Sequence, residues 1–291
     1  MKTKAWGICL ILLFALSACS RPAQLKQAPA KAAADATLLL AQNLEQKHRY
    51  LDSFQSFESA LSQYRSFANL RGELYALSGL ARLAYIQGQQ AEFEQYHQRL
   101  EYLTKYADQS AHYVLLVLDL FCLQQEKRYA EIQNLARDSY DYPVAIRMQI
   151  LSYKLQADSY LNPGNSSASY EDLQRLSNRY RRQLKKDFSA DPSVLSSALY
   201  AMAYHNYLSQ DFVTAQKQLD EVVELDSLYE NHPGLGYAHW LRGMVHEGRQ
   251  DKRQAITDYI CAKNVFQHFG NADMTRKVDA ALTRLEVVNH E

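Results

Sequence analysis

Glycine and proline are scarce in this sequence, with ten and six residues among 291. An all-β chain of this length would need more of both at its turns, so the low counts argue against that class. The sequence also lacks a glycine-rich phosphate loop, a nucleophile elbow and a metal-ligand cluster of recognised spacing. We therefore expect a non-catalytic protein with no cofactor and no metal site.

The sequence also has no excess of positive or negative charge, because 32 Lys and Arg residues balance 32 Asp and Glu residues. This balance gives no general attraction to nucleic acid, and we expect no nucleic-acid partner. Cysteine is also rare. After Cys19 only Cys122 and Cys261 remain, each in an apolar helical context. This spacing excludes a disulfide framework and predicts two buried free thiols.

The N-terminus has the three parts of an export signal. Lys2 and Lys4 supply positive charge, residues 5–16 form an apolar run too short to span a bilayer comfortably, and the tetrapeptide Leu-Ser-Ala-Cys ends at Cys19. This tetrapeptide resembles the lipobox of bacterial lipoproteins. The resemblance implies cleavage before Cys19 and acylation of that residue, which then anchors the chain in a membrane. The alternative is an ordinary signal or a short anchor with an incidental cysteine.

These features divide the chain into a signal peptide (1–18), a lipidated tether (19–35) and a folded domain (36–291). The tether contains two prolines and many alanines and has no apolar periodicity. Ser20 follows the lipobox cysteine, at the position where Asp favours retention in the inner membrane during lipoprotein sorting. The resemblance therefore implies the outer membrane of a bacterial cell envelope, with the folded domain facing the periplasm.

The rest of the sequence is periodic. Six positions open an apolar stripe at i, i+4 and i+7, and their sequence numbers increase in steps of 40, 39, 41, 42 and 40. In four copies a glycine or alanine lies twelve positions earlier, which lets a second helix approach the first closely. The six positions are Ser53, Phe93, Ile132, Leu173, Ala215 and Ala255.

This pattern resembles a longer form of the tetratricopeptide repeat, in which the period is about 40 residues. The closest stretches are 48–61 and 248–262, and the match is degenerate in the middle of the chain. The resemblance covers about residues 37–289 and implies an all-α, right-handed α-solenoid of about six helical hairpins. One more apolar stripe follows Gly270 and predicts a capping helix at the open end of the stack. The alternative is a generic helical bundle with accidental spacing.

Aromatic residues are plentiful, with 21 tyrosines in the chain. In tetratricopeptide stacks one face of each first helix lines a concave groove. The resemblance places six residues of the fifth and sixth hairpins on that face, and Tyr75, Arg82 and Tyr85 on the matching face of the second. The alternative is that these rings only pack between helices. The six predicted partner-binding residues are Tyr200, Tyr204, Tyr207, Tyr237, Trp240 and Met244.

Three further groups of residues have a plain structural interpretation. His239 and His246 are seven positions apart on one helix face, about 10 Å, which is too far for one metal ion without a third element. Glu247 is the one residue that we would name as the catalytic acid if the protein were an enzyme acting on cell-wall glycan. The basic run at residues 175–186 and the acidic run at 220–226 predict two complementary outer helix faces, and the alternative for the basic run is a dock for anionic lipid or an acidic partner.

Taken together, these features predict a membrane-anchored, non-catalytic adaptor of the tetratricopeptide type. We expect it to bind envelope proteins or their peptide segments and to contact the membrane through the lipid on Cys19. A glycan-binding lipoprotein could also use an aromatic groove, and a cell-wall-acting enzyme is the third possibility.

Overall fold

The computed structural model describes residues 28–108, 111–136, 142–163, 168–187 and 190–287. All regular elements in these ranges are α-helices. In chain order they are α2 (Pro29–Gln46), α3 (Tyr50–Ser66), α4 (Leu70–Ile86), α5 (Gln90–Thr104), α6 (Tyr113–Gln125), α7 (Tyr129–Leu135), α8 (Val144–Leu161), α9 (Ala168–Leu184), α10 (Pro192–Leu208), α11 (Phe212–Leu228), α12 (His232–Gly248), α13 (Lys252–His268) and α14 (Ala272–Val287).

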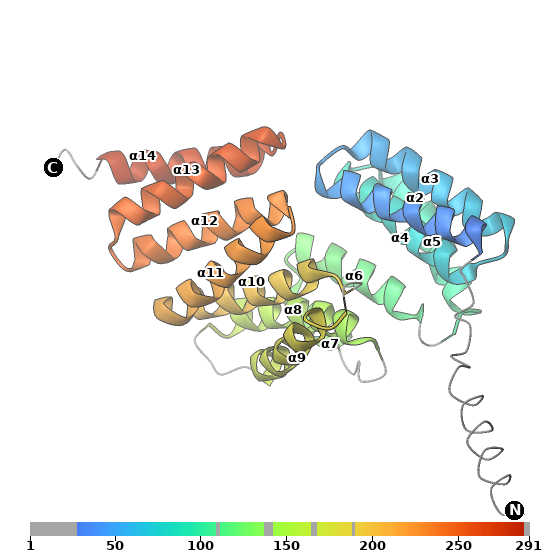
Figure 1. Cartoon of the computed structure of the whole chain (residues 1–291), viewed down its shortest axis with the longest axis horizontal. Coiled ribbons are helices and arrows are strands. Elements are labelled where there is room, and N and C mark those ends of the chain that lie inside the picture. The colour runs from blue at the N-terminus through green and yellow to red at the C-terminus, as the bar shows by residue number, and fades with distance from the viewer. Residues whose placement is uncertain (1–27, 109–110, 137–141, 164–167, 188–189, 288–291) are drawn as a thin grey trace, which may run out of the picture.

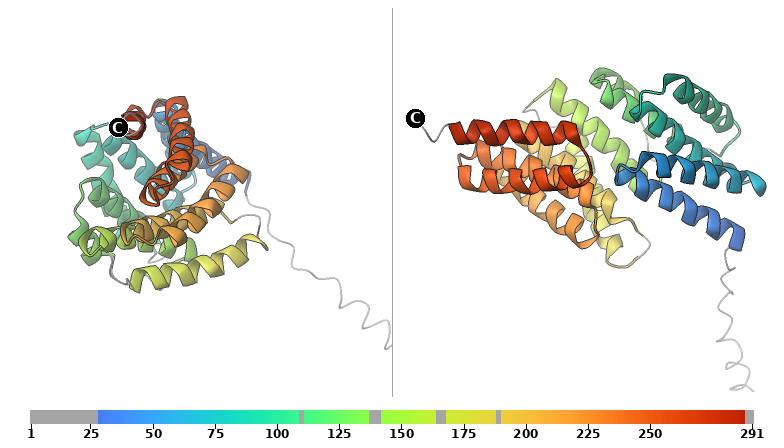
Figure 2. Two further views of the ribbon diagram at one scale, coloured as in Figure 1. Left: turned by 90° about the vertical axis from the view of Figure 1, so that its left-hand side faces the viewer. Right: turned by 90° about the horizontal axis from the view of Figure 1, so that it is seen from above.

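Consecutive helices pack as six hairpins, from α2–α3 to α12–α13, and α14 covers the last of them (Figure 1). The N-terminal and C-terminal hairpins lie at opposite ends of the molecule, and α6–α9 connect them along one side. Seen from its end, the stack curves around a common centre (Figure 2). The predicted all-α solenoid of six hairpins with a capping helix is therefore confirmed.

The contacts between paired helices follow the predicted repeat. In the first hairpin, Ser53 Oγ donates a hydrogen bond of 2.8 Å to the carbonyl oxygen of Ala41. In the sixth, a methyl carbon at Gly243 would lie 2.6 Å from the ring of Tyr259. Both second helices therefore sit directly on a small residue of the first, which is the arrangement that the offset of twelve positions predicts.

Helix starts also agree with the sequence. The side chains of Asp191, Asp211 and Asp251 cap α10, α11 and α13 by accepting hydrogen bonds from backbone N–H groups of the first turn. Pro143 precedes α8, and Pro233 lies in the first turn of α12.

The turns between helices share a backbone conformation that the sequence pattern does not predict. One residue in each of eight turns has φ between 55° and 71°. Six of these residues are not glycine, although a side chain raises the energy of this left-handed conformation by about 1–2 kcal/mol. Their spacing is even at both ends of the chain, where they fall at positions 48, 68 and 88 and at positions 210, 230, 250 and 270. The eight are His48, Ala68, Gly88, Lys127, Gln210, Glu230, Gln250 and Gly270.

One boundary differs from the prediction. The predicted tether ends at residue 35, but α2 begins at Pro29 and Ala34 is fully buried within the first hairpin. Residues 29–35 lack apolar periodicity, yet alanine has the highest helix propensity and proline is favoured in the first turn. The rest of the predicted tether and the predicted signal peptide, with Cys19, lie outside the described residues.

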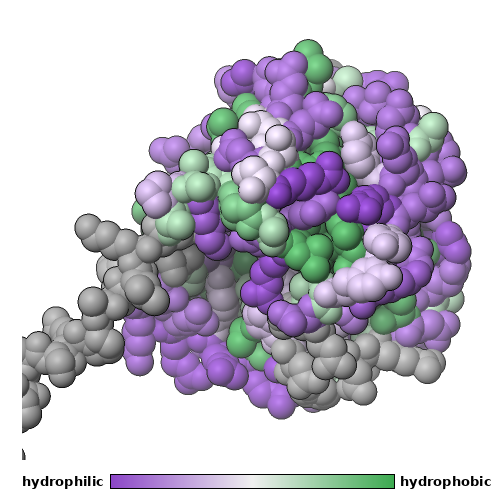
Figure 3. Space-filling view, turned by 90° about the vertical axis from the view of Figure 1, so that its right-hand side faces the viewer, coloured by the Kyte–Doolittle hydropathy of each residue, from purple (hydrophilic) through white to green (hydrophobic). Residues whose placement is uncertain are grey.

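On the face at the N-terminal end, much of the visible surface is hydrophilic, and hydrophobic side chains gather in patches near its middle (Figure 3). No helix among the described residues is both long enough and apolar enough to cross a bilayer.

Candidate functional site

The first helices of all six hairpins turn one face toward a central cavity of about 820 Å³. The second helices contribute only Tyr50 and Phe57 of α3 and Val222 and Asp226 of α11 to its lining. Along each first helix the lining residues follow spacings of three and four, as one helix face requires. The curvature of the stack therefore joins six separate helix faces into one concave surface.

A charged pair ties two of these helices together at the cavity wall. The guanidinium of Arg82 on α4 donates two parallel hydrogen bonds to the carboxylate of Glu45 on α2. Burial alone would lower the pKa of Arg82, but the charge and hydrogen bonds of Glu45 outweigh it and raise that pKa. Their side chains are 29% and 11% exposed, so the two charges neutralise each other inside the cavity.

Tyrosine rings form much of the remaining wall. Tyr153 on α8 and Tyr200 on α10 both line the cavity, and burial raises the pKa of Tyr153 to about 12. Burial also raises the pKa of Tyr200. Tyr50 and Tyr237 line it from the first and sixth hairpins, so rings from opposite ends of the chain face one space.

Amide side chains are one of the polar groups that line the cavity, beside serine and tyrosine hydroxyls. Five glutamines from α2, α6 and α8 contribute to the lining, and Gln124 Nε2 donates a hydrogen bond to Gln156 Oε1 across the α6–α8 junction. An amide both donates and accepts hydrogen bonds, as a peptide bond does. The other three are Gln42, Gln46 and Gln149.

Asp226 is the most deeply buried charged residue of the lining, with 1% of its surface exposed. Asn231 donates a 2.8 Å hydrogen bond to Asp226 Oδ1, whereas Oδ2 is buried without a hydrogen-bond partner among the described residues. Burial raises the pKa of Asp226, and the polar groups of Ser196 and Asn231 offset this only in part. The prediction that the acidic run 220–226 is an outer face is thus wrong for Asp226, which turns inward at the end of α11.

The six predicted groove residues divide into two groups. Tyr200 and Tyr237 line the cavity, whereas the other four continue the same faces of α10 and α12 beyond it. Tyr204 donates a 2.7 Å hydrogen bond to the hydroxyl of Tyr160, and its ring lies 6.3 Å from that of Tyr207. Trp240 packs on Tyr259 with ring centroids 5.2 Å apart, and Met244 packs against the neighbouring core.

The matching residues of the second hairpin divide in the same way. Tyr75 and Arg82 line the cavity. Tyr85 instead packs edge-on against Phe93 and Phe121, with ring centroids 5.4 and 5.9 Å away. The sequence reasoning missed Glu45, Tyr153 and Asp226, although the first two occupy the same helix face in the first and fourth hairpins.

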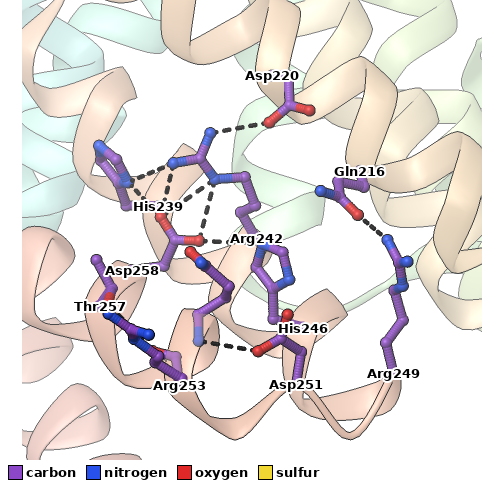
Figure 4. Close-up of polar contacts among 11 residues, drawn as sticks. Gln216, Asp220, His239, Arg242, His246, Arg249, Asp251, Arg253, Thr257 and Asp258 are labelled. Carbon is purple, nitrogen blue, oxygen red and sulfur yellow. Dashed lines mark hydrogen bonds and ion pairs between the residues drawn. The ribbon is translucent and has the colours of Figure 1, made fainter.

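The two histidines of α12 converge on a carboxylate of the next helix (Figure 4). His239 Nδ1 lies 2.8 Å from Asp258 Oδ1, and His246 Nε2 lies 3.5 Å from Asp258 Oδ2. Arg242, one turn from each histidine, donates hydrogen bonds to both oxygens of Asp258 and to Asp220 of α11. Asp258 is therefore a third group beside the two histidines, but both of its oxygens accept hydrogen bonds from the guanidinium of Arg242. No cluster suited to a metal occurs in the described part of the chain.

Several other predicted features form ordinary structural contacts. Glu247 accepts hydrogen bonds from Arg284 and Tyr259. In the basic run, Arg181 pairs with Glu221 at 2.7 Å, and Arg175 pairs with Asp172.

The two cysteines are free thiols, and each is partly buried. Burial raises the pKa of Cys122 to about 12 and raises that of Cys261 as well. A raised pKa keeps the thiol protonated at neutral pH, so neither cysteine has the character of a nucleophile.

No protein-family profile matches the chain, and no curated protein is significantly similar to it in sequence. Among solved structures, the chain is similar to yeast Tom70, with 13% sequence identity and a TM-score of 0.22 over 87% of this chain and 69% of that one. A TM-score this low does not establish a shared fold, so the description as a solenoid of tetratricopeptide-like hairpins rests on the helices and contacts given above.

Proposed function

We propose that the chain is a lipid-anchored, non-catalytic scaffold of the bacterial cell envelope that binds an extended segment of a partner protein in its central cavity. The observation that carries this proposal is the convergence of six first helices on one cavity of about 820 Å³. This volume lies within the range of pockets that bind ligands, and a lining built from six helix faces offers contacts along an extended ligand.

The chemistry of the lining favours a polypeptide backbone. Glutamine amides from three helices can each accept from a peptide N–H and donate to a peptide carbonyl group. Tyrosine rings between them supply apolar contact at a small cost in side-chain entropy. Such a surface holds an extended chain largely through its main chain and selects side chains at a few positions.

The membrane part of the proposal depends on the N-terminal segment. The lipobox resemblance at Cys19 supports lipid attachment, and Ser20 supports the outer membrane. A folded domain that begins at Pro29 leaves about ten residues after Cys19, which could reach roughly 35 Å when extended. The cavity would then lie close to the membrane surface, where envelope proteins are within reach.

A photo-crosslinking amino acid placed inside the cavity tests the binding role. Ser197 is exposed and lines the cavity, whereas Val213 is 71% exposed on α11 and does not line it. We expect a crosslinker at Ser197 to capture one defined protein in living cells, and the same crosslinker at Val213 to leave that protein uncaptured. Equal capture at both positions, or none at Ser197, would contradict the proposal.

Glycan binding is the second candidate, because tyrosine rings and amides also bind sugars. A purified Ser197→Cys variant decides between the two. Soluble cell-wall fragments should protect the introduced thiol from alkylation if a glycan occupies the cavity, and should have no effect if the occupant is a polypeptide.

A further inference from the structure

One wall of the cavity carries negative charge without a compensating cation. Asp191 and Asp226 both contribute to this wall, which is formed by α10, the end of α11 and the start of α12. On the opposite side Glu45 is neutralised by Arg82. Among the described residues of the lining, Arg82 is the only permanent cation, and burial lowers the pKa of His48 and so favours its neutral form. The cavity therefore has an excess of carboxylates on one side.

Of the two carboxylates on this wall, Asp226 is the buried one, so its negative charge is the more unfavourable. A buried carboxylate is unfavourable unless an opposite charge or several hydrogen bonds compensate it. The polar groups of Asn231 and Ser196 stabilise Asp226 in part, with Asn231 donating to Oδ1, but Oδ2 has no hydrogen-bond partner in the described structure. A substitution at Gly234 would bring a methyl carbon 2.6 Å from this oxygen, so the backbone of α12 closes over one side of it. A cation on the cavity side would supply the missing compensation.

Two tyrosine rings line the same cavity from α10 and α12, two of the helices that form this wall. Tyr200 lines the cavity further along α10 from Asp191, and Tyr237, which is 37% exposed, lines it from α12. The ring of Tyr237 is held edge-on by Phe266, with centroids 5.1 Å apart, so it keeps its orientation. The faces of aromatic rings attract cations, and the attraction grows where water is excluded.

We infer that the wall formed by Asp191, Asp226, Tyr200 and Tyr237 binds a cationic side chain, lysine or arginine, of the extended segment that occupies the cavity. This inference rests on the proposed function and adds to it the chemistry of the partner. The carboxylates supply charge, and the rings supply contact with the aliphatic stem and the charged end. On the opposite side Glu45 is already paired with Arg82, so that side offers no free carboxylate to a second cation.

A selection from a random peptide library tests the inference and the proposed function separately. The full chain, solubilised from membranes in detergent, is the bait, and the Asp191→Asn and Asp226→Asn variants are run in parallel. Asparagine keeps the shape of both side chains and still caps α10 at position 191. Glu224→Gln is the matched control, because Glu224 is exposed on the same helix as Asp226 but does not line the cavity.

We expect wild type and Glu224→Gln to enrich peptides with lysine or arginine at one shared position, and both aspartate variants to lose that preference. Enriched peptides without a cationic preference would overturn the inference and leave the proposed function standing. A library that yields no binder to the wild-type cavity would overturn both.

Binding measurements on one selected peptide then assign the contact. Replacing its lysine or arginine by norleucine should weaken binding to wild type about tenfold or more, since a tenfold change corresponds to about 1.4 kcal/mol. The same replacement should change binding to Asp226→Asn by less than about threefold. Equal losses on both proteins would contradict the inference. Thermal melting of each variant shows whether it is folded, and Asp191→Asn provides the second test if Asp226→Asn is not.

Discussion

Arg284 of the capping helix α14 donates three hydrogen bonds to the carboxylate of Glu247 on α12, at 2.8–3.1 Å. Tyr259 of α13 donates to the same carboxylate at 2.8 Å. One side chain of the sixth hairpin therefore joins three helices at the end of the stack. The arrangement shows that α14 is held by a specific polar contact as well as by apolar packing.

The apolar packing of α14 should matter more than this ion pair. Val278 is fully buried, whereas the side chain of Arg284 is 57% exposed. We predict that Arg284→Gln lowers the free energy of unfolding by less than about 1 kcal/mol, because exposed ion pairs contribute little. Deletion of residues 272–291 should uncover the apolar face of α13 and promote aggregation. Chemical denaturation and light scattering measure the two effects; a deletion variant that stays monomeric with wild-type stability would contradict the capping role.

The turns predict a stabilising substitution. Gln250 has φ of 63° and Gly270 has φ of 70° at equivalent turns. Glycine adopts this conformation without the steric cost of a side chain, so Gln250→Gly should raise the free energy of unfolding by about 0.5–1 kcal/mol. The reverse change, Gly270→Ala, should lower it by about 1 kcal/mol. Denaturant midpoints of the two variants measure the effects, and changes of the same sign would rule out the explanation.

The buried carboxylate of Asp258 should make stability depend on acid pH. Burial alone would raise the pKa of Asp258, but hydrogen bonds from His239 and Arg242 outweigh it and hold the pKa below its ordinary value of 3.8. The contribution is therefore present above pH 3.8 and is lost as the pH falls through the lower pKa of the folded state. Asp258→Asn should cost about 3 kcal/mol at pH 7, because it leaves Arg242 without its buried partner.

Melting temperatures of wild type and Asp258→Asn between pH 7 and pH 3 test this prediction. The difference between the two proteins should be largest near neutral pH and should shrink at the acid end. Asp220→Asn is the control, since the side chain of Asp220 is 53% exposed and its pairing with Arg242 should contribute less than about 1 kcal/mol. A difference that does not depend on pH would show that the ionised form of Asp258 is unimportant.

The predicted groove residues should separate by function. Trp240 is partly buried and packs on Tyr259, so Trp240→Ala should lower the free energy of unfolding by about 3 kcal/mol. Tyr237 lines the cavity and is 37% exposed, so Tyr237→Ala should lower it by less than half as much and should reduce capture of a partner by a crosslinker at Ser197. Denaturation and crosslinking on the same variants measure both quantities. The opposite ranking would place the binding surface on the outer part of these helices.

Lipid attachment can be tested without reference to the folded part. Cys19→Ala should abolish incorporation of a radiolabelled fatty acid and release the protein from the membrane fraction, because the thiol is the predicted attachment point. Ser20→Asp is the companion variant and should move the protein toward the inner membrane in a bacterium with this sorting rule. Equal labelling of wild type and Cys19→Ala would end the lipoprotein interpretation.

The local pairing of helices was determined by the sequence alone. Ala41 with Ser53 and Gly243 with Ala255 stand at a fixed offset, and a small residue opposite an apolar stripe specifies a hairpin through contacts between near neighbours in the chain. The aspartate caps are equally local, since each side chain binds the backbone within three positions. Such signals can be read from one short stretch at a time, and the structure confirms them.

The binding surface, in contrast, was decided only by the tertiary structure. Asp226 belongs to an acidic run that suggests a solvent-exposed face, and only the position of α11 at the end of the cavity turns it inward. Glu45 and Arg82 are 37 residues apart and meet because adjacent hairpins stack. Which of the predicted aromatic residues face the cavity depends on the rotation that each hairpin adds to the curvature of the stack. That rotation is a sum of many small packing differences spread over the whole chain, and no single segment of the sequence contains it.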